Sequence, residues 1–377
     1  MNDLPLSYDH IRPYFDEEVP EVLQRLSEKP SFFMLMQYLF PEQSGETIVE
    51  RFSNIRSVEQ FQEEYIRHAI RRMLADSAGE VTIDGIDKLH PDRQYTFLSN
   101  HRDIILDPGI LNVILKEQGF HTTKIAIGDN LLVSGLVTDL MKLNKSFIVH
   151  REVARSDLMA YSQRLSQYIR DQIVEEIDSV WIAQRSGRTK DGNDETHTGL
   201  LKMLNISGKG DAKENFRRLN LIPMAVSYEY DPCDGLKAEE LCHLHAGIPY
   251  EKDDKVGMIR GIRDPKGRIH LAFGRPVNEW IDELPEPRNL NVWLRELADA
   301  LDKEIHLHFR LWPSNFIAVD YLEGNERHAA AYSEMDKQAF DAHMVGQLAK
   351  RKGDPEALKK QFLQIYAAPV WNREQYD

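Results

Sequence analysis

The segment FLSNHRDIILDP, residues 97–108, marks a point where a strand runs directly into a helix. Residues 95–99 are mostly aromatic, apolar or β-branched, which is typical of a buried strand. Pro108 suits the first turn of a helix, and Asp107 stands before it, where an N-cap residue is favoured. A strand followed at once by a helix is the repeating unit of α/β folds, whose sheets are mostly parallel.

The same alternation continues on both sides of this segment. Short β-branched runs predict strands at 81–83, 95–99, 124–127, 147–150, 180–183, 222–228 and 269–273. Helical spacing of apolar residues predicts helices between them at 109–118, 131–143 and 157–177. We therefore predict an α/β domain over residues 79–280, with a mixed, mostly parallel central sheet flanked by helices.

The two ends of the chain have a helical pattern instead. Residues 17–40 and 53–73 carry apolar residues at helical spacing, and Pro30 is expected to divide the first stretch into two helices. After Pro276, helices are predicted at 292–309, 330–351 and 355–366. The predicted organisation is a small helical N-terminal module over 1–78 and a helical C-terminal extension, packed on the core, over 281–377.

Charge and composition exclude several classes of protein. The 377 residues include 47 Lys and Arg against 61 Asp and Glu, a net charge of −14, which argues against a general nucleic-acid binder. The two cysteines, Cys233 and Cys242, cannot build a disulfide framework, and the first residues lack a signal-peptide pattern. No apolar run approaches the roughly 20 residues of a spanning helix. We expect a cytoplasmic protein whose contact with the inner face of the membrane is at most peripheral.

His101 follows the strand at 95–99, at the carboxyl end where α/β folds place their sites. A nearby carboxylate that accepts one imidazole N–H fixes the tautomer and leaves the other nitrogen as a general base. Both Asp103 and Asp107 are candidates for this partner, and the Pro108 that follows favours Asp107. Capping of the next helix is the alternative role for Asp107.

Two further strands are followed by cations. His150 and Arg151 come after the strand at 147–149, and the strand at 180–183 leads into Arg185, Ser186, Gly187, Arg188 and Lys190. In an acidic protein, cations gathered at strand ends point to an anion, and arginine forks suit phosphate or carboxylate. A solvated basic loop is the alternative.

Taken in order, these segments and the strand that opens with Ile222-Pro223 resemble the four sequence blocks of the glycerolipid acyltransferases. That family includes glycerol-3-phosphate and 1-acylglycerol-3-phosphate (lysophosphatidate) acyltransferases. Its first block is Asn-His-x4-Asp, whereas five residues separate His101 from Asp107 here. Residues 182–190 align without gaps on Ile-Ala-Pro-Ser-Gly-Gly-Arg-Asp-Arg of the soluble plant-type enzymes, and Arg185 stands where the common form has Glu. The resemblance spans residues 79–280.

The resemblance implies an enzyme that moves a fatty acyl group in phospholipid synthesis. The donor would be acyl-CoA or acyl carrier protein, and the acceptor a hydroxyl of glycerol-3-phosphate or 1-acylglycerol-3-phosphate. His101 would act as the general base and Asp107 would orient it. The acceptor phosphate would be held by Arg151, Arg188 and Lys190, with His150, Arg185, Ser186 and Gly187 as further binding residues. Because a thiolate leaves readily, no metal or other cofactor is required.

Three alternatives remain open at this point. The altered spacing in the first block and the missing Glu are compatible with a non-catalytic relative that binds lipids or acyl carrier protein. An acyltransferase acting on another lysolipid is a second alternative. A metal-dependent hydrolase that uses the His and Asp residues is a third.

Overall fold

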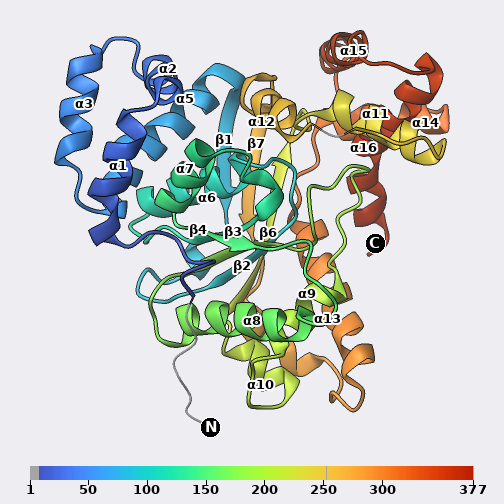
Figure 1. Ribbon diagram of the computed structural model, residues 1–377. Coiled ribbons are helices and arrows are strands. Elements are labelled where there is room, and N and C mark those ends of the chain that lie inside the picture. The colour runs from blue at the N-terminus through green and yellow to red at the C-terminus, as the bar shows by residue number, and fades with distance from the viewer. Residues whose placement is uncertain (1–7, 252, 377) are drawn as a thin grey trace.

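The computed structural model describes residues 8–251 and 253–376. In this part of the chain a seven-stranded sheet lies at the centre, with the strand order β1-β7-β6-β2-β5-β3-β4 (Figure 1). The strands are β1 (Ala78–Asp84), β2 (Thr96–Ser99), β3 (Lys124–Gly128), β4 (Ser146–Val149), β5 (Val180–Ala183), β6 (Leu221–Tyr228) and β7 (Gly267–Phe273). Every predicted strand overlaps one of them.

The direction of the strands decides where the loops meet. β6, β2, β5, β3 and β4 run parallel to one another, whereas β7 is antiparallel to β6 and parallel to β1. In the register, Ser99 at the end of β2 lies opposite Ala183 of β5 and Met224 of β6. The carboxyl ends of five strands therefore share one edge of the sheet. The predicted α/β class, with a mixed and mostly parallel sheet, is confirmed.

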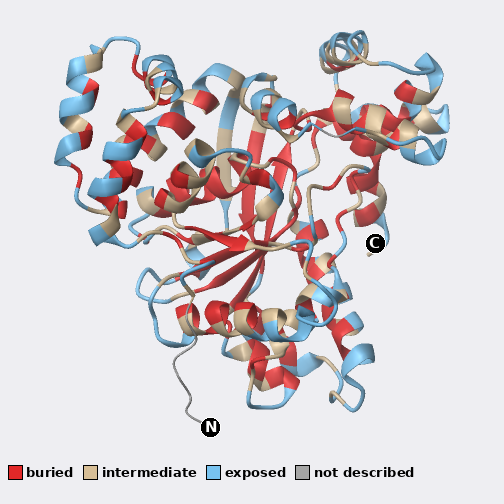
Figure 2. Cartoon of the chain, viewed as in Figure 1, coloured by how far each residue is buried: buried red, intermediate tan, exposed pale blue. Residues whose placement is uncertain are grey.

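Helices cover both faces of this sheet (Figure 1). Alternate residues of each strand face opposite sides, so Phe97 packs in one core and Leu98 in the other. The first face is covered by the N-terminal helices and by α6 (Leu106–Glu117) and α7 (Gly135–Leu143). The second is covered by α8 (Leu158–Val174), α9 (Thr198–Asn205), α10 (Ala212–Arg217) and α13 (Leu290–His308). The central strands β2 and β6 are buried along their whole length, whereas no residue of the edge strand β1 is fully buried (Figure 2).

The N-terminal helices form one flank of the molecule. They are η1 (Asp16–Glu18), α1 (Val19–Ser27), α2 (Pro30–Leu39), α3 (Gly45–Asn54), α4 (Val58–Phe61), the π-helical turn η2 (Gln62–Ile66) and α5 (Arg67–Ser77). Pro30 is the first residue of α2 and divides the stretch as predicted. The helix predicted over 53–73 is wrong at its start, because α3 ends at Asn54 and the Ser57 side chain caps a new helix by accepting from Gln60 N.

A third core holds the C-terminal helices together at the other flank. It contains α11 (Asp234–His245), α14 (Pro313–Glu323), α15 (Glu334–Leu348) and α16 (Pro355–Glu374). Pro313 lies between the helices predicted at 292–309 and 330–351, but it is the first residue of a further helix, α14. The helix predicted over 355–366 continues past Pro369 to Glu374. The domain boundaries at 79 and 281 stay predictions; in the structure α13 packs on the sheet and α11 packs with the C-terminal helices.

The remaining elements are connections. They are η3 (Ile86–Lys88), η4 (Asp129–Leu131), α12 (Asp254–Arg263), η5 (Val277–Glu279), η6 (Ile281–Glu283) and η7 (Ala329–Ala331). None of the helices in the described residues has both the length and the apolar content that crossing a bilayer demands.

Candidate active site

The loop after β2 brings His101 and Asp107 together. Nδ1 of His101 lies 2.9 Å from Oδ2 of Asp107, whose side chain is completely buried. The same oxygen accepts the backbone N–H groups of Arg102, at 2.6 Å, and Asp103, at 3.0 Å. Because the carboxylate accepts at Nδ1, that nitrogen carries the hydrogen and Nε2 is left with a lone pair. The pair has the geometry of a general base and its orienting group.

Asp103, in the same loop, does not bond to His101 but caps the helix that follows. Its Oδ1 accepts from the backbone N–H groups of Ile105, at 2.9 Å, and Leu106, at 2.8 Å, where α6 begins. Asp103 therefore satisfies the first donors of the helix, the role that the sequence offered to Asp107. Because α6 starts at Leu106, Asp107 lies inside its first turn and its side chain reaches back to His101.

Two aromatic residues that the sequence analysis did not single out complete this pair. The hydroxyl of Tyr228, at the end of β6, donates to Oδ1 of Asp107 over 2.7 Å. Burial, followed by the negative charge of Asp107, raises the pKa of Tyr228 well above its ordinary value, so the hydroxyl stays protonated. On the other side, the ring of Trp181 meets the imidazole of His101 edge-on, with 5.5 Å between centroids.

Arg102, the residue after His101, points into the protein rather than toward a ligand. Its guanidinium lies 2.6 Å from Asp194 and 2.9 Å from Asp231, and it also donates to the backbone oxygen of Gly192. Burial disfavours the charge of Arg102, but the two carboxylates outweigh it and raise the pKa of the guanidinium. Asn100, before the histidine, donates to Asp194 as well. The His101 loop is thus anchored on both sides by buried polar contacts.

His101 lines a cavity of about 780 Å³ at the carboxyl edge of the sheet. Its polar wall holds five of the predicted binding residues, namely His150, Arg151, Arg185, Ser186 and Gly187. Its apolar wall comes from the neighbouring strands, from η4 and the loop after β4, and from α8 and α9. The residues are Ile127, Leu131, Val149, Val153, Leu158, Leu165, Trp181, Ile182, Leu200 and Met203. A base, two guanidinium groups and an apolar surface therefore line the same cavity.

Two predicted phosphate ligands lie elsewhere. Lys190 forms an ion pair with Glu240 of α11 and does not line the cavity. Arg188 is also absent from its lining and lies against Gly257 of α12. Burial works against the charge of Arg188, but neighbouring groups, Cys233 first, raise the pKa of the guanidinium. The reason is the direction of the loop: Thr189 N donates to the backbone oxygen of His101, and the chain beyond it turns toward α11.

His150 lines the cavity but is already engaged. Its Nδ1 lies 2.9 Å from Oδ2 of Asp129, at the end of β3. Burial opposes ionisation of Asp129, yet the hydrogen bonds from His150 and from backbone N–H groups together outweigh it, and the pKa of the carboxyl is lowered. Asp129 also accepts from the backbone N–H of Arg151, at 3.3 Å. Asp129, a residue that the sequence analysis did not single out, therefore holds the segment that carries Arg151.

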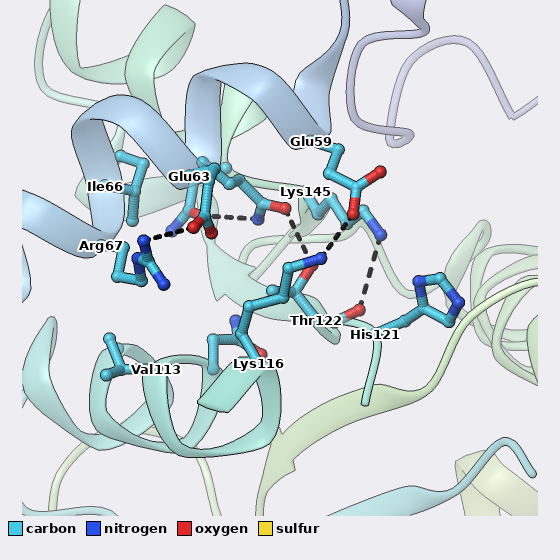
Figure 3. Close-up of a pocket in the computed structure, with 13 residues that line it drawn as sticks. Glu59, Glu63, Ile66, Arg67, Val113, Lys116, His121, Thr122 and Lys145 are labelled. Carbon is cyan, nitrogen blue, oxygen red and sulfur yellow. Dashed lines mark hydrogen bonds and ion pairs between the residues drawn. The ribbon is translucent and has the colours of Figure 1, made fainter. Parts of the chain in front are cut away.

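A second, smaller cavity of about 70 Å³ lies near the opposite edge of the sheet, where β3 and β4 begin (Figure 3). Its charged side chains have partners within the protein. Glu59 pairs with Lys116, Glu63 with Arg67, and Lys145 with Asp178. This cavity has neither the size nor an unpaired charge that would make it the better candidate.

Comparison with known proteins bears on this site directly. Residues 80–226, from β1 into β6, match the sequence model of the family described as Acyltransferase. No curated protein gives a significant match. Among solved structures, the chain is similar to the 1-acyl-sn-glycerophosphate (LPA) acyltransferase PlsC from Thermotoga maritima. The two are 10% identical, the match covers 76% of this chain and 94% of that one, and the TM-score is 0.35. By the family match, residues 80–226 form an acyltransferase domain, which confirms the family predicted from the four sequence blocks.

Proposed function

We propose that this protein transfers a fatty acyl group from acyl-CoA or acyl carrier protein to a hydroxyl of glycerol-3-phosphate or 1-acylglycerol-3-phosphate, in phospholipid synthesis. One observation carries the proposal. The hydrogen-bonded pair of His101 and Asp107 borders a cavity that also contains Arg151 and Arg185. A base beside two guanidinium groups suits an acceptor that presents a hydroxyl and a phosphate on the same molecule.

The proposed reaction needs only groups of this chain and of the substrates. Nε2 of His101 takes the proton of the acceptor hydroxyl as its oxygen attacks the thioester carbonyl. Asp107, bonded to Nδ1, stabilises the imidazolium that forms. The tetrahedral intermediate then collapses, the carbon–sulfur bond breaks, and the proton on Nε2 passes to the leaving thiolate. The products are an ester and a thiol, and no metal or other cofactor enters the proposed scheme.

Arg151 and Arg185, the two arginines of the cavity wall, are the candidates for holding the acceptor phosphate. In the described residues, neither Arg151 nor Arg185 forms an ion pair with a carboxylate. Pairing with a phosphate would supply the missing partner through charge-assisted hydrogen bonds. We therefore place the acceptor phosphate on Arg151 and Arg185 rather than on Arg188 and Lys190. The apolar wall of the cavity would receive the acyl chain.

Acyl transfer by the purified protein tests this proposal. Labelled palmitoyl-CoA and palmitoyl-acyl carrier protein would each be offered with glycerol-3-phosphate and with 1-acylglycerol-3-phosphate. We expect product with one acceptor, and a loss of about 10²–10⁴-fold in the rate of the His101→Ala variant, the usual contribution of a general base. His121→Ala, which alters a histidine of the second cavity, is the matched control and should retain the wild-type rate.

Each other result changes the conclusion. No product from any donor and acceptor, with a folded protein, contradicts the proposed reaction. Binding of acyl carrier protein or lysolipid without turnover would instead favour the non-catalytic relative. Transfer that is unaffected by His101→Ala would refute the role of the histidine. Loss of transfer on adding a chelator would favour the metal-dependent alternative.

A further inference from the structure

We propose that Tyr228 is a positioning residue for the catalytic pair: its hydroxyl fixes the Asp107 carboxylate, and the carboxylate in turn fixes the imidazole of His101. The inference rests on the proposed function for its effect on rate. The bond itself is a property of the fold. Tyr228 ends β6, a strand buried along its whole length, so its ring cannot move away without disturbing the sheet.

The hydrogen bonds of Asp107 are divided unequally between its two oxygens. Oδ2 accepts from His101 and from the backbone N–H groups of Arg102 and Asp103. Oδ1 accepts from Tyr228 at 2.7 Å. Asp107 is fully buried, so an Oδ1 without this donor would lose a hydrogen bond that water cannot replace. The plane of the carboxylate is thus determined by the backbone on one side and by Tyr228 on the other.

Tyr228 acts through Asp107 and not on the substrate. It does not line the 780 Å³ cavity, whereas His101 does. The loss of its hydroxyl should therefore leave substrate binding unchanged and lower the rate of the chemical step, because the base would be less well aligned with the acceptor hydroxyl. This separation of kcat from KM distinguishes positioning from a general loss of structure.

The Tyr228→Phe variant removes only the hydroxyl. We expect kcat to fall about tenfold or more, the size expected for a lost hydrogen bond to a charged group, with KM for both substrates within twofold of wild type. Tyr65→Phe is the matched control: that tyrosine is also buried, but its hydroxyl has no hydrogen-bond partner in the described residues. An unchanged kcat in Tyr228→Phe, or equal losses in both variants, would overturn the proposal.

A double-mutant cycle tests the route through Asp107. In the Asp107→Asn background, Tyr228→Phe should change kcat by less than twofold, because the carboxylate that it positions is already gone. The same tenfold effect in both backgrounds would mean that Tyr228 acts independently of Asp107, and the proposal would be wrong.

A spectroscopic measurement separates this inference from the proposed function. The proton between His101 Nδ1 and Asp107 should give a downfield NMR signal that is missing in His101→Ala. Tyr228→Phe should displace the signal and Tyr65→Phe should not. If no acyl transfer is found but the signal moves, the positioning role stands and the proposed function falls. A signal that Tyr228→Phe leaves in place refutes the positioning role.

Asp107→Asn tests the same bond without altering Tyr228. With tyrosines labelled at the ring carbon that bears the hydroxyl, this variant should shift the Tyr228 signal and leave that of Tyr65 in place. The experiment remains decisive if Tyr228→Phe does not fold. An unshifted Tyr228 signal would contradict the proposed bond.

Discussion

Nη2 of Arg102 lies 2.6 Å from Oδ2 of Asp194, and each of these side chains is only 2% exposed. Arg102 directly follows His101, and Asp194 lies in the long connection after β5, so the ion pair joins these two loops. Asp231, after β6, is the second carboxylate on the same guanidinium. Three strand ends are thereby joined through one buried cation.

Arg102→Met should destabilise the protein strongly. The substitution keeps an apolar stem of similar length. It leaves the buried Asp194 without its cation, whereas Asp231 keeps its ion pair with Lys237. Removing one partner of a buried pair costs about 3–5 kcal/mol. We expect a loss of that size in the free energy of unfolding, measured by urea denaturation.

Arg268→Met is the control for this prediction. Arg268 also pairs with a glutamate, Glu229, but its side chain is 41% exposed. Exposed ion pairs contribute at most about 1 kcal/mol, so this variant should remain close to wild type. Equal losses in the two variants would show that burial of Arg102 does not set the cost.

The cations that the sequence assigned to the acceptor phosphate should divide into two groups by their effect on the KM for the acceptor. Arg151→Gln should raise the KM for the acceptor by about 10–100-fold, because a hydrogen bond to a charged group contributes about 1.5–3 kcal/mol. Lys190→Gln should leave it within twofold of wild type, since Lys190 pairs with Glu240 outside the cavity. Steady-state kinetics at saturating donor would measure both. A larger effect from Lys190→Gln would favour the assignment made from the sequence.

Asp302 should make stability depend on pH. Burial raises the pKa of this carboxyl to about 7, although Thr196 donates two hydrogen bonds to it. Because this pKa is higher in the folded than in the unfolded protein, the native state holds a proton that the unfolded state has lost. The stabilising contribution is complete below about pH 4 and is lost as the pH rises toward 7, by about 1.4 kcal/mol per pH unit.

Asp302→Asn should remove that slope, because an amide does not titrate. The free energy of unfolding of wild type and variant would be measured by urea denaturation between pH 4 and 8, and their difference should change with pH only below about 7. Asp299→Asn, an exposed neighbour on the same helix, should run parallel to wild type. Parallel curves for wild type and Asp302→Asn would contradict the prediction.

The sheet could be predicted because most of its strands are short, apolar and bounded by turns. The helices that were not predicted lack such sequence signals. Pro313 begins α14, although a proline more often suggests a break, and α11 carries no clear apolar stripe because it is packed on several sides. Strand order is not written in local sequence: β7 lies between β1 and β6 through contacts made across the whole chain.

For the site, the sequence identified the residue types, but it did not show where every side chain points. His101 and Asp107 are close in sequence, so their pairing follows from one turn of chain. Arg188 and Lys190 lie in a loop whose path depends on α11 and α12, and spacing alone cannot show that Lys190 reaches Glu240. Tyr228 lies 121 residues from Asp107, and nothing in the local pattern distinguishes it from an ordinary core tyrosine.

Gly192 and Gly187 offer a comparison of two glycines with the same backbone conformation. Their φ angles are +80° and +79°, so a side chain at either position pays for a left-handed conformation, about 1–2 kcal/mol. Their surroundings differ. A Cβ on Gly192 would lie 2.1 Å from the backbone oxygen of Ile365 in α16, whereas a Cβ on Gly187 would meet nothing within 4 Å.

Gly192→Ala should therefore destabilise the protein well beyond Gly187→Ala. The backbone of α16 cannot yield as a flexible side chain would, and the oxygen of Gly192 also accepts from Arg102, so displacing it would strain the anchor of the His101 loop. We expect a loss of about 1–2 kcal/mol for Gly187→Ala and clearly more for Gly192→Ala, both from urea denaturation. Similar losses in the two variants would mean that α16 does not press against this turn, and that the C-terminal helix does not support the loop.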